Sequence, residues 1–311
     1  MARDLHARSS CDDVLEGVDM TGRSVLVTGG SGGLGAESAR ALAGAGATVV
    51  LAGRDLAKTR GVAEQILDAR PGAEVEVLPL SLDSLASVRA CADAYLARYE
   101  GLDVLLENAA VMACPLRRSA EGYDLQFATN HLGHFLLAEL LLPALRQAAP
   151  SRVVVVGSGA HWFAPVQFDD IRFERSDYHP WVAYGQAKSA NALFALEFER
   201  RHGRDGVHAY SLHPGAIHTE LGRHLTQDTN VPVPDDRMKT LTQGASTQVY
   251  LASAPERELE GFGGRYFEDC APAEPREERV DAMALGCAPW ARDPELAAQL
   301  WELSERAVAG G

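Results

Sequence analysis

Several features that define whole classes of protein are missing from this sequence of 311 residues. Lysine is scarce, at three residues, and acidic side chains outnumber basic ones, which gives a formal net charge of −14. Such a charge repels phosphate backbones and anionic lipid headgroups, and the pair Arg117 and Arg118 is too small to form a basic patch. We therefore expect no nucleic-acid or membrane-surface partner.

Long apolar runs are absent as well. The longest, Phe135 to Leu142, is interrupted by Glu139 and is far shorter than the roughly 20 residues that a membrane-spanning helix needs. The first residues, MARDLHARSSCDD, carry charges and lack the apolar stretch of a secretory leader. The sequence therefore predicts no membrane span and a cytoplasmic location.

The five cysteines are widely spaced and form no CxxC pair, so we expect free, buried thiols. Histidine often binds metals, and the sequence contains two closely spaced histidine pairs: His131 with His134, and His213 with His218. Neither pair has a third ligand at a sensible spacing. We expect neither a disulfide nor a metal site.

What is present is the pattern of an α/β protein. From Ser24 onward, short β-branched runs alternate with longer helical patterns, which is typical of βαβ units. The pattern predicts a Rossmann-type, doubly wound parallel sheet of seven strands in a single domain over 1–311. The expected strands are 25–28, 48–52, 74–78, 104–106, 152–156, 207–212 and 265–267. The expected helices are 35–45, 56–69, 85–99, 123–148 and 183–202.

Segments outside this alternation are expected to have separate roles. An N-terminal extension covers 1–22, and Asp293 followed by Pro294 predicts the start of a C-terminal helix over 294–308. Two irregular segments, 160–181 and 216–239, follow strands at the carboxyl edge of the sheet and could form a substrate lid. The first segment contains aromatic residues that either line an apolar pocket or pack the lid onto the body: Trp162, Phe163, Tyr178 and Trp181.

A glycine-rich run, TGGSGGLG, lies between the first strand and the first helix. Glycines there let backbone amides approach a pyrophosphate, and the helix N-terminus adds partial positive charge. A flexible turn without a ligand is the alternative. A dinucleotide fits the arrangement better, with contacts expected from Thr28, Gly29, Ser31, Gly33, Leu34 and Gly35.

The residue after the second strand indicates which of the two nicotinamide cofactors, NAD or NADP, is bound. NAD-binding units carry an acidic residue there for the ribose 2′-hydroxyl, whereas this chain has Gly53 and Arg54. Arg54 can pair with a 2′-phosphate, which favours NADP over NAD. The alternative is that Arg54 is a solvated surface charge and that Asp55 binds the ribose.

Tyr184 and Lys188 are four residues apart in a helical pattern, so their side chains share one face. A nearby ammonium group stabilises a phenolate, which suits the tyrosine to acid/base work. Ser158 follows an apolar strand at the carboxyl edge and could hold a carbonyl oxygen. Asn130 is an amide among apolar residues and could bind a water linked to Lys188.

Together, TGGSGGLG, ENAA at 107–110, Asn130, Ser158, Tyr184 with Lys188, and HPGAIHT at 213–219 resemble the short-chain dehydrogenase/reductase family, in order and spacing, over nearly the whole chain. The phrases DDVLEGVDMTGRSVLVTGG, YGQAKSANALFALEF, RYFEDC and LWELSE resemble its retinol-dehydrogenase-like and WW-domain-oxidoreductase-like branch, without a WW module.

The resemblance implies Tyr184 as acid/base, Lys188 holding the nicotinamide ribose, Ser158 polarising the substrate oxygen and Asn130 anchoring a relay water. It also implies cofactor contacts from Ser81, Leu82, Asn108, Ala109, Ala110, Pro214, Gly215, Ile217 and Thr219. Three departures touch the cofactor site: Ser81 replaces the usual aspartate, and Glu107 and Ala110 alter the usual NNAG. We expect altered cofactor affinity and a preserved reaction type.

The sequence thus predicts an NADP(H)-dependent oxidoreductase that interconverts an apolar or bulky alcohol with its ketone or aldehyde, and that forms a homodimer or homotetramer. Two alternatives remain. One is a dinucleotide-sensing protein that keeps the fold without turnover, and the other is an NAD-preferring alcohol dehydrogenase.

Overall fold

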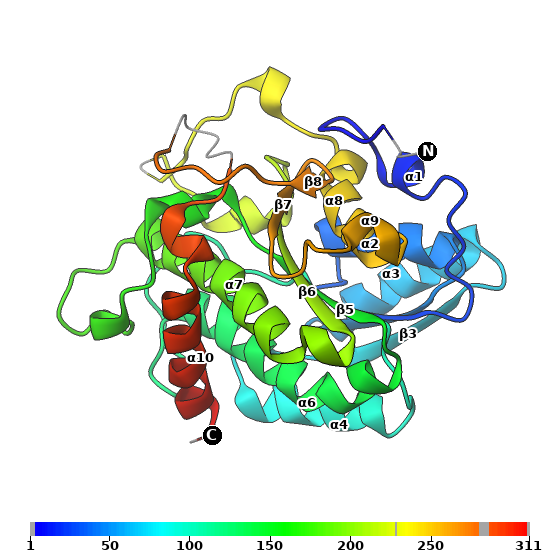
Figure 1. Cartoon of the computed structure of the whole chain (residues 1–311), viewed down its shortest axis with the longest axis horizontal. Coiled ribbons are helices and arrows are strands. Elements are labelled where there is room, and N and C mark those ends of the chain that lie inside the picture. The colour runs from blue at the N-terminus through cyan, green and yellow to red at the C-terminus, as the bar shows by residue number, and fades with distance from the viewer. Residues whose placement is uncertain (1–3, 228, 280–285, 310–311) are drawn as a thin grey trace.

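The computed structural model describes residues 4–227, 229–279 and 286–309, which form one eight-stranded sheet with helices on both faces (Figure 1). The order along the sheet is β3-β2-β1-β4-β5-β6-β7-β8. All pairs are parallel except β7 with β8. The strands are β1 Ser24–Thr28, β2 Thr48–Gly53, β3 Glu74–Pro79, β4 Val104–Glu107, β5 Ser151–Val156, β6 Val207–His213, β7 Tyr266–Glu268 and β8 Ala271–Pro272.

The predicted doubly wound sheet is confirmed, but the predicted number of seven strands is one too few. The additional strand, β8, has two residues, Ala271 and Pro272, and pairs antiparallel with β7. A two-residue strand shows no alternation of apolar and polar residues, so the sequence pattern could not reveal it.

The strand order reverses beside β1, which lies between β2 and β4. The chain runs outward through β2 and β3 on one side and through β4, β5 and β6 on the other. Open α/β sheets bind ligands at such a point, at the carboxyl ends of the strands. The topology therefore brings the ends of β1, β4, β5 and β6 to one cleft.

Two helical layers bury the two faces of the sheet, each over its own apolar core. The first layer contains α4 Leu85–Leu96, α6 Gly133–Gln147 and α7 Pro180–His202, with α10 Pro294–Ala309 packed on α7 (Figure 1). The second contains α2 Gly33–Gly44, α3 Leu56–Ala69, α8 Leu241–Ser253 and the short helices α1 Cys11–Val14 and α9 Glu256–Leu259. The expected C-terminal helix is confirmed.

The continuous helix expected over 123–148 is interrupted. A short helix, α5 Leu125–Phe127, leads into a π-helical turn, η1 Ala128–Leu132, and only then does α6 begin. Asp124 caps α5 by accepting hydrogen bonds from the amides of Gln126 and Phe127. The π turn carries Asn130, so the widening of the helix falls on a predicted site residue.

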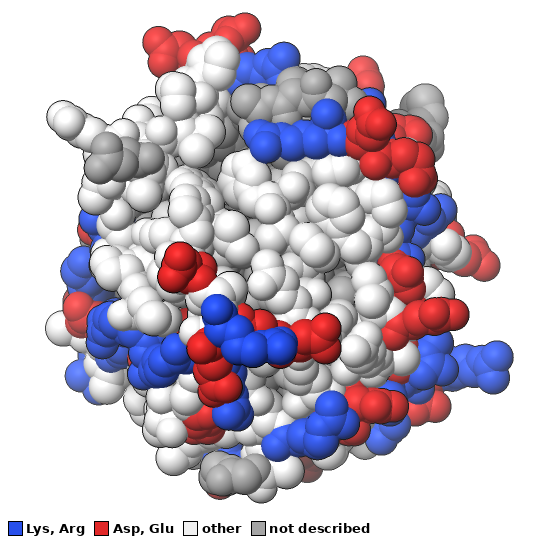
Figure 2. All heavy atoms as spheres, turned by 90° about the vertical axis from the view of Figure 1, so that its left-hand side faces the viewer, with Lys and Arg blue, Asp and Glu red and all other residues white. Residues whose placement is uncertain are grey.

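All five cysteines are buried and free, as expected. Within the described ranges, no helix is both long and apolar enough to cross a membrane. The face drawn in Figure 2 has a broad uncharged centre surrounded by mixed acidic and basic side chains, and its described residues form no continuous basic patch.

Candidate active site

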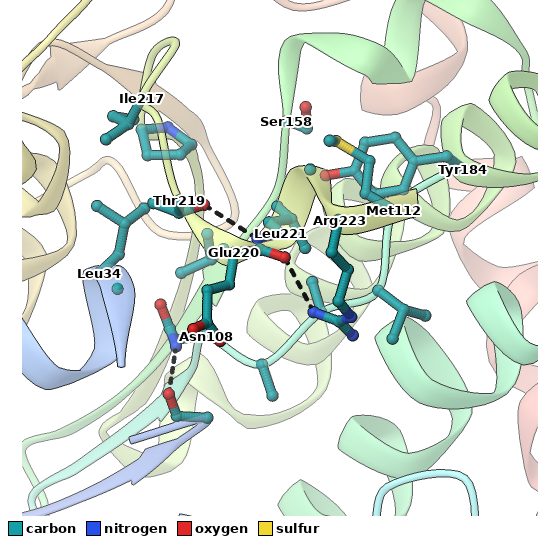
Figure 3. Close-up of a pocket in the computed structure, with 18 of the residues that line it drawn as sticks. Leu34, Asn108, Met112, Ser158, Tyr184, Ile217, Thr219, Glu220, Leu221 and Arg223 are labelled. Carbon is teal, nitrogen blue, oxygen red and sulfur yellow. Dashed lines mark hydrogen bonds between the residues drawn. The ribbon is translucent and has the colours of Figure 1, made fainter. Parts of the chain in front are cut away.

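A cleft of about 890 Å³ opens at the carboxyl ends of β1, β4, β5 and β6 (Figure 3). Most of the predicted site residues line it. These are Gly29, Ser31, Gly33, Leu34, Arg54, Ser81, Leu82, Asn108, Ala109, Ala110, Ser158, Tyr184, Lys188, Pro214, Gly215, Ile217 and Thr219. Thr28, Gly35 and Asn130 do not line the cleft and hold neighbouring backbone in place.

The glycine-rich run adopts a conformation that only glycine tolerates. Gly29 has φ of 72°, and a Cβ there would lie 2.8 Å from the Cα of Ala109. A Cβ on Gly35 would lie 2.5 Å from Nδ2 of Asn108. The loop is thus packed closely against the end of β4, with the N-terminus of α2 facing the cleft, and it suits a pyrophosphate.

Thr28 links the ends of β1 and β4 beneath this loop. Its Oγ1 accepts hydrogen bonds from the amides of Asn108 and Ala109, both at 3.0 Å. The Nδ1 of His134 donates to the carbonyl of Asn130 (3.1 Å), and its Nε2 lies 2.8 Å from Oγ1 of Thr28. Burial lowers the pKa of His134 to about 3, so the ring is neutral and fixes the loop.

Arg54 is exposed and lines the cleft just after β2. The neighbouring Asp55 caps α3, because its carboxylate accepts a hydrogen bond from the amide of Lys58 at 3.1 Å. Lys58 also lines the cleft, and its Nζ lies 3.4 Å from the carboxylate of Glu220 in the second loop. Two cations thus flank the end of β2, and the sequence reasoning singled out only Arg54.

A carboxylate lies close to the position where the family has its usual aspartate. Oγ of Ser81 donates to Oδ1 of Asp83 at 2.7 Å, and both residues line the cleft. Asp83 is two residues after Ser81 and was missed. The departure at Ser81 therefore leaves an acidic group at this edge of the cleft.

Tyr184 is 3% exposed and lies beside Ser158 in the cleft (Figure 3). Burial raises the pKa of Tyr184 to about 12, and a hydrogen bond with the Ser158 side chain acts in the opposite direction. Oγ of Ser158 also accepts from the amide of Ala160 at 3.1 Å, which fixes its rotamer. The pair can present two hydroxyl groups to one substrate oxygen.

Lys188 is fully buried one turn after Tyr184. Its Nζ donates to the carbonyl of Val156 at 2.7 Å and lies 5.7 Å from the centre of the Tyr184 ring. Burial lowers the pKa of Lys188 to about 7, and Glu107 acts in the opposite direction. The predicted pairing of tyrosine and lysine on one helix face is present.

Both ends of the Asn130 side-chain amide are hydrogen-bonded to the backbone of Val111. Its Oδ1 accepts from the amide of Val111 at 2.8 Å, and its Nδ2 donates to the Val111 carbonyl at 2.9 Å. This pair of bonds holds the strand-end segment 108–111 against the π turn. The side chain therefore orients backbone at the rim of the cleft.

The aromatic residues of the first loop divide between the two roles that the sequence left open. Phe163 and Trp181 line the cleft, with ring centres 5.4 Å apart, and Trp181 lies edge-on to Tyr184 at 5.9 Å. Trp162 is buried and donates to the carbonyl of Gly286. Tyr178 donates to the carbonyl of Cys114. Two rings thus face the site and two pack the loop.

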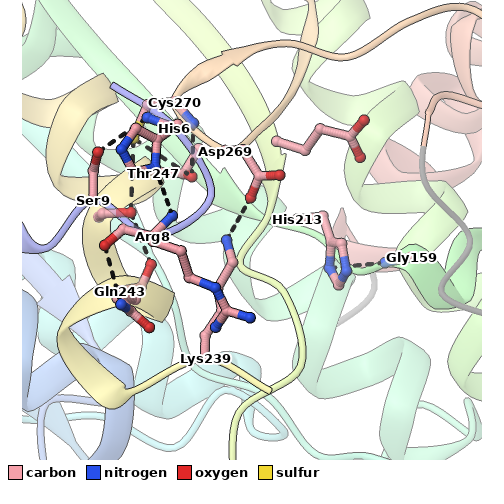
Figure 4. A network of polar contacts seen from close by, with 12 residues as sticks. His6, Arg8, Ser9, Gly159, His213, Lys239, Gln243, Thr247, Asp269 and Cys270 are labelled. Atoms are coloured by element: carbon pink, nitrogen blue, oxygen red, sulfur yellow. Dashed lines mark hydrogen bonds and ion pairs between the residues drawn. The ribbon is translucent and has the colours of Figure 1, made fainter. Parts of the chain in front are cut away.

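The N-terminal extension is hydrogen-bonded to the second loop, 216–239, and to the helix α8 that follows it (Figure 4). The guanidinium group of Arg8 donates to the carbonyls of Asp236 and Met238, and the Arg8 carbonyl accepts from Gln243 at 3.0 Å. Nζ of Lys239 pairs with Asp269 at 2.5 Å. These contacts fix the return end of the loop 216–239 on the body of the molecule.

Sequence reasoning missed several lining residues because nothing in their local pattern marks them. Met112 faces Tyr184, and Arg223 projects from the short helix η5 Glu220–His224 (Figure 3). Both depend on how the loops fold over the cleft. Among the described residues, no three histidine, cysteine or acidic side chains converge as a metal site needs. His131 instead bonds to Ser304.

A switch-point cleft with a glycine-rich cradle, a buried tyrosine and lysine, and a serine beside the tyrosine defines a dinucleotide-binding oxidoreductase. The short chain dehydrogenase model matches residues 23–230. A probable oxidoreductase of Streptomyces antibioticus is 43% identical over 94% of this chain and 99% of its own. Human retinol dehydrogenase 14 is 39% identical over 92% of this chain and 86% of its own. A solved structure of an uncharacterized protein from Mycobacterium paratuberculosis matches with a TM-score of 0.74 and 34% identity, over 97% of this chain and 98% of its own.

The chain belongs to the short-chain dehydrogenase family, and within it to the retinol-dehydrogenase-like branch. It is an oxidoreductase of that family, which uses nicotinamide dinucleotides. The resemblance found in the sequence motifs is confirmed.

Proposed function

We propose that the protein interconverts an apolar or bulky alcohol with its ketone or aldehyde, with NADP(H) as hydride carrier and Tyr184 as acid/base. The observation that carries the proposal is the convergence of Tyr184, Ser158 and Lys188 at the floor of the cleft. Their placement beside the glycine-rich cradle puts proton transfer next to the expected position of a nicotinamide ring.

The cradle fits the cofactor because Gly29 and Gly35 leave no room for a side chain and α2 begins there. Ser31, Gly33 and Leu34 would hold the pyrophosphate, and Lys188 the nicotinamide ribose. When bound, the dinucleotide supplies the hydride. Arg54 and Lys58 favour a 2′-phosphate, since the Asp55 carboxylate is engaged in capping α3.

In the reducing direction, Ser158 and Tyr184 donate hydrogen bonds to the substrate oxygen, and Tyr184 then gives up its proton. Lys188, as an ammonium group below the ring, stabilises the phenolate that results. Phe163, Trp181 and Met112 form an apolar wall next to this position, which suits a bulky hydrocarbon substituent.

The test compares Tyr184→Phe and Ser158→Ala with the wild type. Each substitution removes one hydroxyl group, and we expect turnover to fall by about 10²- to 10⁴-fold with NADPH binding retained. Tyr178→Phe is the matched control, because that hydroxyl group bonds to Cys114 outside the cleft. Unchanged turnover in Tyr184→Phe contradicts the proposal.

A dinucleotide sensor without turnover is the second candidate, motivated by Glu107, Ala110 and Ser81, which depart from the family pattern. Binding of NADPH without any Tyr184-dependent chemistry would favour it. The NAD-preferring dehydrogenase remains a third candidate, and tighter binding of NADH than of NADPH would support it. A homodimer or homotetramer and a cytoplasmic location remain predictions.

A further inference from the structure

Glu107 is a buried carboxyl group that the proposed chemistry does not use. It ends β4 and is 1% exposed, and neither carboxylate oxygen has a hydrogen-bond partner among the described residues. Leaving a buried acid unsatisfied is costly, so such a group in a native protein requires an explanation.

The sheet register places Glu107 close to Lys188. Leu105, two residues earlier on β4, packs in the core that α6 and α7 cover, and strand alternation puts Glu107 on the same face. Glu107 is paired with Val155 of β5, and the next residue, Val156, provides the carbonyl to which Lys188 donates. The carboxylate and the ammonium group therefore share one buried compartment below Tyr184.

The titratable groups around Glu107 come from two helices. Lys188 on α7 interacts with its charge, and His134 on α6 interacts with that of Lys188. His134 is neutral with both ring nitrogens engaged, and it supplies no negative charge to pair with Lys188. Burial raises the pKa of Glu107 well above its usual range, and the charge of Lys188 acts in the opposite direction. The charge of Glu107 in turn counteracts the lowering of the Lys188 pKa by burial.

We propose that Glu107 is a positioning residue: it is the buried counter-ion that keeps Lys188 protonated, so that Lys188 can stabilise the Tyr184 phenolate. Only the effect of Glu107 on catalysis rests on the proposed function; its effect on the protonation of Lys188 does not. Burial alone makes a lysine lose its proton near neutral pH, and the opposite charge of Glu107 counteracts that loss.

The first test uses the cofactor-free protein and needs no turnover. Because the chain has three lysines, protein labelled with ¹³C and ¹⁵N in lysine gives three side-chain NMR signals, and Lys58→Arg and Lys239→Arg assign that of Lys188 by elimination. We expect its titration midpoint to fall by about one pH unit or more in Glu107→Gln. In Glu107→Asp, which retains the charge at a greater distance, the midpoint should lie between those of the wild type and Glu107→Gln.

Glu139→Gln is the matched control, since Glu139 is a partly buried carboxylate on α6 with its nearest ion pair at His202. It should leave the Lys188 midpoint unchanged. A midpoint in Glu107→Gln equal to that of the wild type would overturn the proposal, because Glu107 would then be a neutral acid. Should Glu107→Gln not fold, a midpoint in Glu107→Asp equal to that of the wild type would overturn it equally.

The second measurement is the pH profile of kcat/KM for carbonyl reduction. The alkaline limb should move to lower pH by about one unit in Glu107→Gln. A purely structural role would lower kcat/KM at all pH values without moving the limb. If Glu107→Gln shifts the NMR midpoint of Lys188 but the wild type reduces no carbonyl, the pairing of Glu107 with Lys188 stands. The oxidoreductase proposal is then refuted instead.

Discussion

At the residue scale, we infer the cofactor preference from side chains at the end of β2. Arg54 and Lys58 both face the end of β2, where a 2′-phosphate would lie. Gly53 has no room for a side chain, because a Cβ there would lie 2.6 Å from Oγ1 of the buried Thr59 on α3. Arginine binds phosphate through paired hydrogen bonds, which a lysine cannot replace.

We predict that Arg54→Ala weakens NADPH binding by about 10-fold or more and leaves NADH binding within about 2-fold, since one charge-assisted hydrogen-bonding group contributes roughly 1.5–3 kcal/mol. Fluorescence titration of both cofactors measures this. Arg60→Ala, which removes an exposed arginine of α3 that does not line the cleft, serves as the control. Equal losses for the two cofactors would count against an NADP preference.

At the scale of elements, the order of strands and the carboxyl-edge cleft follow from the βαβ alternation, which the sequence displays clearly. The spacing of Tyr184 and Lys188 follows from helical geometry alone. The helix α8 was missed because its sequence, LTQGASTQVYLAS, is small and polar where it packs near Leu34 and Ile217. A capping box at Thr240 and Gln243 was the available signal.

The segment 216–239 could be predicted from the sequence as an irregular region, but its conformation could not. Its contacts join distant parts of the chain, as when Arg8 bonds to Asp236 and Met238, and no local pattern encodes them. Which aromatic residues of the first loop line the cleft and which pack the loop onto the body also depends on contacts between distant parts of the chain. Likewise, the burial of Glu107 beside Lys188 depends on the sheet register.

The hydrogen bonds between the N-terminal extension and the second loop lead to a prediction about the loop as a whole. Arg8→Ala removes the donors to two loop carbonyls, so the loop 216–239 should be cleaved several-fold faster in limited proteolysis. Arg98→Ala, which breaks a surface ion pair with Glu76 away from the loop, is the control. Equal cleavage rates would show that Arg8 does not restrain the loop.

For the whole molecule, α10 covers the outer side of α7 (Figure 1). Trp301 is 2% exposed, stacks on Phe194 and meets Phe135 edge-on at 4.9 Å. A homodimer or homotetramer that packs α7 against its copy would have to displace α10. We therefore expect any oligomer to use another surface.

Trp301→Ala should lower the free energy of unfolding by about 3–5 kcal/mol, because it removes a large buried ring from this contact. Chemical denaturation measures the change, and size-exclusion chromatography shows whether α10 has exposed a new interface. Glu302→Ala, on the exposed side of the same helix, should change stability by less than about 0.5 kcal/mol. A Trp301→Ala protein as stable as the wild type would mean that α10 is not docked as described.

Buried histidines make global stability depend on pH. Burial lowers the pKa of His131 from 6.5 to about 3, so below pH 6.5 the unfolded chain binds a proton that the folded chain does not. Stability is therefore lost as the pH falls from 6.5 towards 3. His131→Gln should reduce this loss by about 1.4 kcal/mol per pH unit, measured by denaturation at pH 7, 6 and 5. The same exchange at exposed His179 is the control, and equal slopes for the wild type and His131→Gln would contradict the account.

The function that we propose for this cleft is Tyr184-dependent hydride chemistry with NADP(H). The most direct measurement titrates wild type and Tyr184→Phe with NADPH, then follows nicotinamide absorbance with a panel of bulky ketones and aldehydes. We expect both proteins to bind NADPH and only the wild type to oxidise it. Binding without oxidation by either protein, or equal oxidation by both, would contradict it.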